Sequence, residues 1–140
     1  MSDGKSLPLP VINEVTAPFW EGCRKHVFLL QRCSGCRAYR YRPESYCPKC
    51  NSASFTWEQS TGKGTVYTYT VTHNPFHPGL LGKLPLAIVL VKLEEGVLVT
   101  SNVVDASPEE IAIGMPVEVC FEDVTSEITL PKFRKRNWAV

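Results

Sequence analysis

The alternation of apolar and polar residues in the second half of the chain predicts a small all-β domain. The segment 64–72 (GTVYTYTVT) alternates, which places Tyr67, Tyr69 and Val71 on one expected strand face. The next apolar run, LAIVLVKL, ends at a tight turn over 94–96. No helical period interrupts these strands, and the pattern favours a Greek-key barrel. The predicted strands span residues 64–72, 86–93, 97–104, 116–122 and 128–133.

The N-terminal part of the chain predicts an arm followed by a helix. Residues 1–17 contain prolines and little periodicity, so we expect an extended arm. Residues 18–31 place apolar side chains at helical spacing, and Pro18 suits a first helical turn. A strand that begins near Val27 is the alternative interpretation. The expected apolar helix face comprises Phe19, Trp20, Cys23, Val27, Leu29 and Leu30.

Two connections between the predicted strands carry signals of their own. The segment 73–85 (HNPFHPGLLGKLP) contains three prolines and two glycines. A loop of this length inside a compact domain is typical of a functional or mobile segment. In the connector 105–114, Ser107 and Pro108 predict the start of a helix, with Ser107 as its cap.

Length and charge restrict the classes of protein to consider. The chain has 140 residues, 44% of them hydrophobic, which suits one compact domain or a small domain with an appended module. The formal net charge of +1 gives no global attraction to nucleic acid or membranes. No apolar run approaches the roughly 20 residues that span a bilayer, and residues 1–10 lack the pattern of a signal peptide. We therefore expect a cytoplasmic protein with no membrane partner.

Two cysteine pairs are the clearest chemical signal in the chain. Cys33 with Cys36, and Cys47 with Cys50, each enclose two residues, and ten residues separate the pairs. A CxxC turn aims two thiolates at one ion, so the four cysteines predict a tetrahedral Zn²⁺ site in a zinc ribbon. Four protein ligands leave no position for a water molecule, which makes the expected zinc structural rather than catalytic.

Other interpretations of the cysteines stay open at this point. Two disulfides would fit the same spacing, although a reducing cytoplasm favours a metal. Iron bound as in rubredoxin requires the same four thiolates. The remaining Cys23 and Cys120 are expected to be small buried apolar residues rather than nucleophiles.

Several motifs occur in a fixed order along the chain, and together they closely resemble the DUF35 family. This family comprises rubredoxin-like zinc ribbon plus OB-fold proteins associated with acyl-CoA metabolism, and the likeness covers roughly residues 18–134. The cysteine pairs alone are not specific to it, whereas their combination with the glycine-rich strand is. The motifs are Phe19-Trp20, Leu30-Gln31-Arg32-Cys33, Tyr41-Arg42-Pro43, Cys47-Pro48, Trp57, Gly62-x-Gly64-Thr65-Val66-Tyr67, Ile113-Gly114-Met115-Pro116-Val117 and Pro131-x-Phe133-Arg134.

The resemblance implies a mainly β fold with an N-terminal helix, a rubredoxin-like zinc ribbon and a five-stranded OB-fold barrel. We expect residues 1–30 to form the arm and helix, residues 31–57 the zinc ribbon, and residues 58–140 the OB-fold domain. The implied function is that of a non-catalytic accessory subunit of a thiolase-type acyl-CoA-converting complex. Proteins of this family, such as the small subunit of benzylsuccinyl-CoA thiolase, accompany thiolase-superfamily enzymes, acyl-CoA hydratases or aldolases.

The implied partner, a thiolase-like catalytic subunit, needs a docking surface, and acyl-CoA is a possible shared ligand. Aromatic and arginine residues are enriched at interface hot spots, the 73–85 loop could line a pantetheine tunnel, and the basic C-terminal segment could bind CoA phosphates. Each group also has a plain structural interpretation: rings that cover the zinc core, an ordered surface loop and a solvated tail. The candidate contact residues are Phe19, Trp20, Tyr39, Tyr41, His73, Phe76, His77, Lys132, Arg134, Lys135 and Arg136.

No complete catalytic constellation can be assembled, because His73 and His77 have no nucleophile paired with them. The alternative function is a single-stranded nucleic-acid-binding OB-fold protein, with Tyr67 and Tyr69 stacking bases from one strand face. The near-neutral charge and the many acidic residues of the predicted barrel argue against nucleic acid as a partner.

Overall fold

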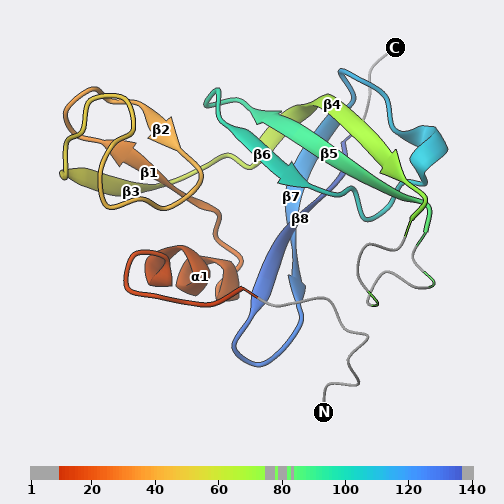
Figure 1. The fold of residues 1–140 in the computed structure, drawn as a ribbon, viewed down its shortest axis with the longest axis horizontal. Helices are drawn as coiled ribbons and strands as arrows, with labels where there is room; N and C mark the ends of the chain where they lie inside the picture. The colour runs from red at the N-terminus through yellow and green to blue at the C-terminus, as the bar shows by residue number, and fades with distance from the viewer. Residues whose placement is uncertain (1–9, 75–77, 79–81, 83, 137–140) are drawn as a thin grey trace.

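The computed structural model describes residues 10–74, 78, 82 and 84–136 of the chain. It contains one α-helix beside a small three-stranded sheet, and a larger five-stranded sheet that follows along the chain (Figure 1). The mainly β architecture that the sequence predicts is therefore confirmed. The elements are α1 (Ala17–Arg24), β1 (Leu29–Cys33), β2 (Tyr39–Arg40), β3 (Phe55–Gln59), β4 (Lys63–Thr72), β5 (Leu86–Leu93), β6 (Leu98–Ser101), the 3₁₀ turn η2 (Pro108–Glu110), β7 (Pro116–Asp123) and β8 (Thr129–Lys135).

Helix α1 is shorter than the sequence predicts, because it ends at Arg24 instead of continuing to residue 31. His26 adopts a positive φ of 59° and donates its backbone N–H to the carbonyl of Cys23, which turns the chain out of the helix. Strand β1 then begins at Leu29, close to the alternative strand start near Val27. The apolar residues of this short stretch satisfy a helical period and a buried strand equally well, so periodicity could not separate the two.

Strand β1 is the centre of the three-stranded sheet, which has the order β2-β1-β3 with antiparallel neighbours. Gln31 on β1 lies opposite Arg40 on β2 and opposite Trp57 on β3. Strand β2 is only two residues long. The stretch between the cysteine pairs therefore holds one short strand and turns.

The five-stranded sheet has the order β6-β5-β4-β7-β8, with every neighbouring pair antiparallel. It curls into a partly closed barrel, in which the chain just after β6 reaches β8 through a parallel bridge between Val103 and Phe133. The N–H of Val104 donates to the carbonyl of Phe133 at 2.8 Å, and the N–H of Phe133 donates to Asn102 at 3.1 Å. The apolar run predicted over 86–93 forms β5 with the same bounds.

A β-bulge in β4 corrects the prediction that Tyr67 and Tyr69 share a face. Val66 pairs with Val91, but the next paired residue of β4 is Thr68, so Tyr67 is an extra residue in the strand. Tyr67 is 54% exposed and lies 5.9 Å from Nζ of Lys92, whereas Tyr69 pairs with the buried Val89 and shares its face. The two-tyrosine platform on which the nucleic-acid alternative depended does not form on β4.

Phe28, in the connection between α1 and β1, packs the helix onto both sheets. Its ring centroid lies 6.0 Å from that of Phe19 on α1, 5.9 Å from that of Tyr41 beyond β2 and 6.5 Å from that of Phe133 on β8. Phe28 and Phe133 are almost completely buried. One hydrophobic core therefore runs from the helix into the barrel.

The predicted helix start at Ser107 and Pro108 forms only the single 3₁₀ turn η2, which is tied to β8. The carboxylate of Glu110 accepts hydrogen bonds from the backbone N–H of Ser107 at 2.9 Å and from Nζ of Lys135 at 3.0 Å. These bonds hold the pKa of Glu110 down, at about 2. Among the described residues, no helix has both the length and the apolar character to cross a membrane.

Replacing Gly64 by alanine should destabilise the barrel, because β4 passes close to β5 at this residue. A Cβ at position 64 would lie 2.5 Å from the carbonyl oxygen of Lys92 and 2.9 Å from a methyl carbon of Val91. We expect the free energy of unfolding, measured in urea, to fall by about 1–3 kcal/mol. The neighbouring exposed change Thr65→Ala should alter it by less than about 0.5 kcal/mol, and equal effects would argue against the close approach.

Replacing Glu110 by glutamine should make the barrel less sensitive to acid. The folded-state pKa of about 2 lies below the ordinary value of 4.5, so the ionised carboxylate contributes stability above about pH 4.5. That contribution is lost as the pH falls toward 2. The free energy of unfolding, compared at about pH 6 and about pH 3, should therefore drop less in Glu110→Gln than in the unchanged chain, and equal drops would contradict the prediction.

Candidate metal centre and docking groove

The two CxxC segments fold into turns with the same backbone hydrogen bonds. Cys33 accepts the N–H of Arg37 at 3.0 Å and donates its own N–H to Ala38 at 2.9 Å. Cys47 accepts the N–H of Asn51 at 2.8 Å and donates to Ser52 at 2.8 Å. Each turn ends in a residue with positive φ, 67° at Arg37 and 65° at Asn51. The chain therefore builds the same knuckle twice, once at the end of β1 and once before β3.

The knuckles bring the sulfur atoms of Cys33, Cys36, Cys47 and Cys50 within 4.8 Å of one another. The Sγ atoms of Cys33 and Cys50 are 3.5 Å apart, and those of Cys36 and Cys47 are 3.6 Å apart. A tetrahedron with Zn–S bonds of about 2.3 Å has edges of about 3.8 Å, so this cluster fits a zinc ion. A disulfide requires about 2.05 Å between sulfurs, and none of the six cysteines forms one.

Backbone N–H groups point at the first sulfur of each knuckle and favour its thiolate form. The N–H groups of Cys36 and Gly35 donate to Sγ of Cys33 at 3.4 and 3.3 Å, and the pKa of Cys33 falls to about 6. The N–H groups of Cys50 and Lys49 likewise lower the pKa of Cys47. Thiolates are the metal-binding form of cysteine, so these N–H groups favour metal binding at Cys33 and Cys47. The pKa of Cys50 is instead raised to about 11: the N–H of Ser52 lowers it, but the neighbouring thiols and burial raise it more.

The other two cysteines do not take part in the cluster. Cys23 on α1 is fully buried, and burial raises its pKa to about 12. Cys120 on β7 is half-buried, and its pKa is also raised by burial. Neither thiol has the environment of a nucleophile.

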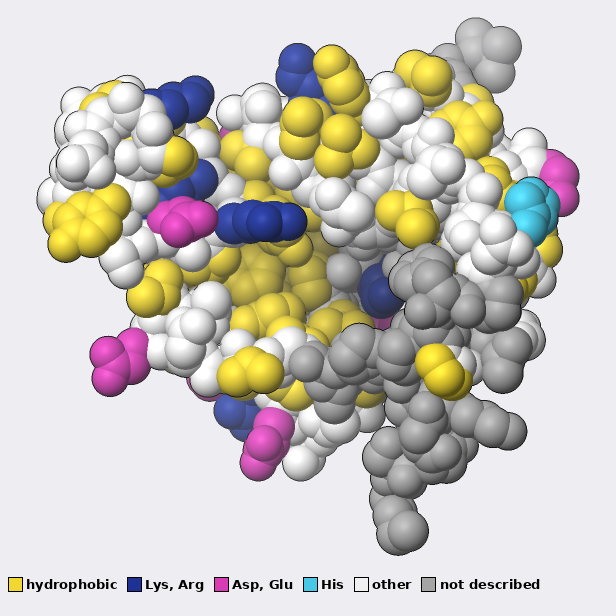
Figure 2. Space-filling model, viewed as in Figure 1, with side chains coloured by type: hydrophobic (Ala, Val, Ile, Leu, Met, Phe, Trp, Pro, Cys, Tyr) yellow, Lys and Arg dark blue, Asp and Glu magenta, His cyan; other side chains and the backbone are white. Residues whose placement is uncertain are grey.

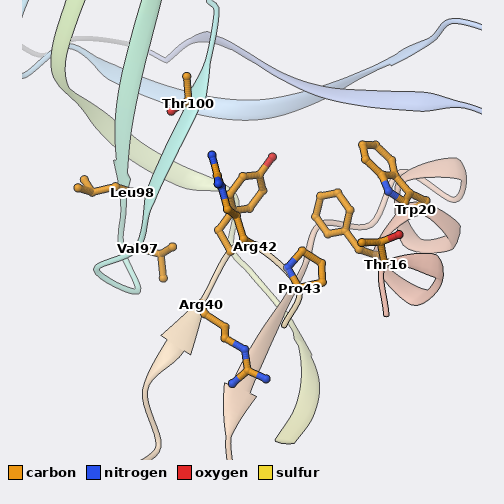
Figure 3. Close-up of a pocket in the computed structure, with 10 residues that line it drawn as sticks. Thr16, Trp20, Arg40, Arg42, Pro43, Val97, Leu98 and Thr100 are labelled. Carbon is orange, nitrogen blue, oxygen red and sulfur yellow. The ribbon is translucent and has the colours of Figure 1, made fainter. Parts of the chain in front are cut away.

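A groove opens where the helix, the small sheet and the barrel meet. It has a volume of about 580 Å³, and Figure 2 shows hydrophobic side chains in the hollow between the ribbon and the barrel. Figure 3 shows that its walls come from three parts of the chain. The lining residues are Thr16, Phe19 and Trp20 from α1 and its start, Arg40, Tyr41, Arg42 and Pro43 from β2 onward, and Val97, Leu98 and Thr100 from the β5–β6 turn and β6.

Aromatic rings form the helix side of the groove. The Phe19 ring meets those of Trp20 and Tyr41 edge to face, at centroid distances of 5.0 and 5.7 Å. Burial raises the pKa of Tyr41 to about 12. Trp20 and Tyr41 are only partly buried, so their outer faces belong to the groove surface. Three of the predicted contact residues, Phe19, Trp20 and Tyr41, are thus brought together at one site.

A buried polar network holds the ribbon side of the groove in place. Nε of Arg40 donates to Oε1 of Gln31 at 2.6 Å, and its Nη2 donates to the carbonyl of Glu44 at 2.9 Å. The N–H of Glu44 returns a hydrogen bond to the same Gln31 oxygen at 2.8 Å. Residues 41–43 lie between these anchors. Sequence reasoning missed this network, and its signal in the sequence was a glutamine that directly follows the apolar Leu29 and Leu30.

The other predicted contact residues that the structure describes are not among the residues that line the groove. Tyr39 donates its hydroxyl to Glu58 within the ribbon sheet, and His73 is exposed at the end of β4. Phe76 and His77 lie outside the described residues. The predicted basic tail belongs largely to β8, and its side chains have partners within the barrel. Lys132 donates to Asn102, Arg134 pairs with Glu118, Lys135 pairs with Glu110, and Arg136 donates to the carbonyls of Val117 and Gly64.

Two family models match adjoining parts of the chain. The rubredoxin-like zinc ribbon domain of ChsH2 matches residues 20–56, and the C-terminal OB-fold domain of ChsH2 matches residues 57–122. A DUF35 domain-containing scaffold protein of Methanocaldococcus jannaschii is 37% identical over 111 residues, which cover 77% of each chain. The chain belongs to the DUF35 family. The predicted combination of a zinc ribbon with an OB-fold barrel is confirmed by these matches and by the two sheets.

Two other similar proteins have names that refer to enzymes. A probable enoyl-CoA hydratase alpha subunit of Thermomonospora curvata is 37% identical over 127 residues, which are 91% of this chain and 39% of the relative. The chain thus spans well under half the length of that relative. A solved structure described as Ltp2-ChsH2(DUF35) aldolase contains a chain 36% identical, with a TM-score of 0.79 over 90% of this chain and 98% of that one.

The family model and the four clustered thiols together support a structural zinc ion. With four protein ligands, such an ion would supply structural rigidity rather than an activated water. Its effect would be to fix the ends of β1 and the start of β3 relative to each other. A sheet with a two-residue edge strand buries too little apolar surface to hold this arrangement by packing alone.

Replacing Cys47 by serine should remove the metal and loosen the ribbon. We expect about one zinc ion per unchanged chain and close to none in Cys47→Ser, measured by atomic emission, with a lower midpoint of thermal unfolding. Cys120→Ser is the matched control, because Cys120 lies outside the cluster and should leave the zinc content unchanged. A native protein with two disulfides and no metal would contradict this prediction.

Proposed function

We propose that this chain is a non-catalytic accessory subunit of an acyl-CoA-converting complex, and that it docks on the catalytic subunit through the groove. The observation that most supports this proposal is that α1, the ribbon and the barrel each supply a wall of one aromatic groove. Relatives described as a hydratase alpha subunit and as part of an aldolase support an assembly of this kind.

A structural zinc ion at the four cysteines would give this surface its rigidity. Cys33 ends β1, Cys36 precedes β2, and the groove residues 41–43 follow β2 directly. A fixed knuckle therefore fixes the segment that carries Tyr41 and Arg42. A preformed surface loses little conformational entropy on binding, which favours a stable complex.

The specific partner we propose is a thiolase-type enzyme, and acyl-CoA is the ligand whose site the complex completes. Exposed His73 opens the 73–85 connection, which remains our candidate for contact with the acyl-CoA or its entrance. The basic residues of β8 are weaker candidates for the CoA phosphates, because they already have partners within the barrel. We also propose that the chain divides into an arm and helix, a zinc ribbon and an OB-fold domain.

The test is to purify the chain at native expression levels, identify the larger subunit that accompanies it, and reconstitute the pair. We expect the catalytic subunit to have little acyl-CoA activity alone and to gain it with this chain. A thiolase, a hydratase or an aldolase activity in the pair would decide the type of partner. A chain that stays alone, or a partner that is fully active without it, would contradict the proposal.

Replacing Trp20 by alanine should weaken that complex without unfolding the chain. Partly buried tryptophans at interfaces are frequent hot spots, so we expect the dissociation constant to rise about 10- to 100-fold in isothermal titration calorimetry. Tyr46→Ala is the matched control, because Tyr46 is an aromatic residue on the ribbon that is 60% exposed and lies outside the groove. Equal losses in the two variants would place the docking surface elsewhere.

A further inference from the structure

Strand β6 presents two residues with free backbone groups to the groove. In an antiparallel pair, residues alternate between those whose backbone groups face the partner strand and those whose groups face away. The N–H of Leu93 donates to the carbonyl of Val97 at 2.9 Å, which fixes this alternation for the β5–β6 pair. The backbone groups of Val99 therefore face β5, and those of Leu98 and Thr100 face outward.

The hydrogen bonds that close the barrel follow the same alternation, and they do not involve the backbone groups of Leu98 and Thr100. The next outward residues, Asn102 and Val104, are the ones that hydrogen-bond to Phe133 on β8. Within the described part of the chain, no backbone partner reaches Leu98 or Thr100. Both residues line the groove, and both are exposed. The open edge of the barrel thus begins where the pairing with β8 stops.

This edge lacks several of the features that protect exposed strands from pairing. β6 has the sequence LVTS, with no charged residue, no proline and no bulge in its pairing with β5. Leu98 is 43% exposed, although it is a large apolar residue. An uncharged edge with free N–H and C=O groups is a template on which another extended segment can add.

The opposite wall of the groove fits the side chains of such a segment. Trp20 and Tyr41 offer partly buried aromatic surface for an apolar side chain. The charged residues among the described lining are Arg40 and Arg42, and none of the described residues that line the groove is acidic. Arg42 is exposed and forms no ion pair within the described residues. Figure 3 shows its side chain extending from the ribbon into the space beside β6.

We propose that the groove accepts an extended segment of the catalytic subunit, which pairs with β6 as an added strand and places an acidic side chain against Arg42. This inference rests on the proposed function and names how its interface is made. A helix could not satisfy the outward groups of Leu98 and Thr100, because its own backbone groups are already paired. A second copy of this chain would bring its own Arg42 to the interface, where like charges repel.

The first measurement is amide hydrogen exchange by NMR on the full zinc-loaded chain, alone and with the purified catalytic subunit. We expect the outward amides of Leu98 and Thr100 to exchange at least about 10-fold more slowly in the complex. The amide of Val99, already bonded to β5, is the internal control and should change much less. A complex that leaves the Leu98 and Thr100 amides unchanged overturns strand addition while the accessory function stands.

The second measurement compares Thr100→Pro with Thr100→Val in binding to the same subunit. Proline removes the outward N–H but no β5–β6 hydrogen bond, and it is tolerated on the free side of an edge strand. We expect the dissociation constant to rise at least about 10-fold for Thr100→Pro and less than about 3-fold for Thr100→Val. Circular dichroism and zinc content verify the fold of both variants, and equal affinities overturn the proposal.

Arg42→Glu provides a test that does not alter the strand. Charge reversal at this exposed side chain should weaken the complex at least about 10-fold, and Arg42→Lys should restore most of the affinity. Other occupants give different results. Protection of the same two amides by free CoA alone assigns the groove to a small ligand, and a dimer in sedimentation that Thr100→Pro dissolves assigns it to a second copy. If no complex forms at all, the accessory function fails, and strand addition fails with it.

Discussion

The packing of aromatic rings around Phe28 is the interaction on which the arrangement of this molecule depends. Phe28 contacts Phe19 of the helix, Tyr41 of the ribbon and Phe133 of the barrel, and it is almost completely buried. The N–H of Ser60 also donates to the carbonyl of Phe28 at 2.8 Å, which ties the ribbon–barrel connection to the same residue. Without this cluster, the ribbon and the barrel would be joined chiefly by a short connection, and no groove of fixed width would lie between them.

The metal centre and the aromatic cluster stabilise opposite ends of the ribbon. Apolar packing acts at the end near Phe28, whereas the thiols act at the far end, where the turns of 33–36 and 47–50 expose half of their cysteines. Between them, the hydrogen bonds of Gln31, Arg40 and Glu44 fix the segment that forms the ribbon wall. Each contribution is local, so the small sheet stays ordered even though β2 has only two residues.

The sequence predicted those features that depend on residue type at a fixed spacing. The two CxxC turns follow from cysteines with two residues between them, and β5 follows from an uninterrupted apolar run. The bulge at Tyr67 could not be predicted, because its position depends on how β4 matches β5, and the alternating pattern of residues 64–72 continues through it. Likewise, the positive φ at Arg37 is set by the knuckle as a whole, whereas Asn51 is a residue type that often adopts it.

The groove was the least predictable feature, because it exists only where three separated segments meet. Phe19, Trp20 and Tyr41 stood out as residue types, but Val97, Leu98 and Thr100 did not, because the strand pattern does not show which strand lies beside the ribbon. The open edge of β6 follows from the topology. The barrel closes through hydrogen bonds of Asn102 and Val104 with Phe133, and these residues come after β6, so the strand itself is not paired with β8. Since Phe133 also packs against Phe28, the contact that closes the barrel also positions the helix and ribbon walls opposite that edge. The width of the groove and the exposure of its strand edge are therefore set by the same buried aromatic pair.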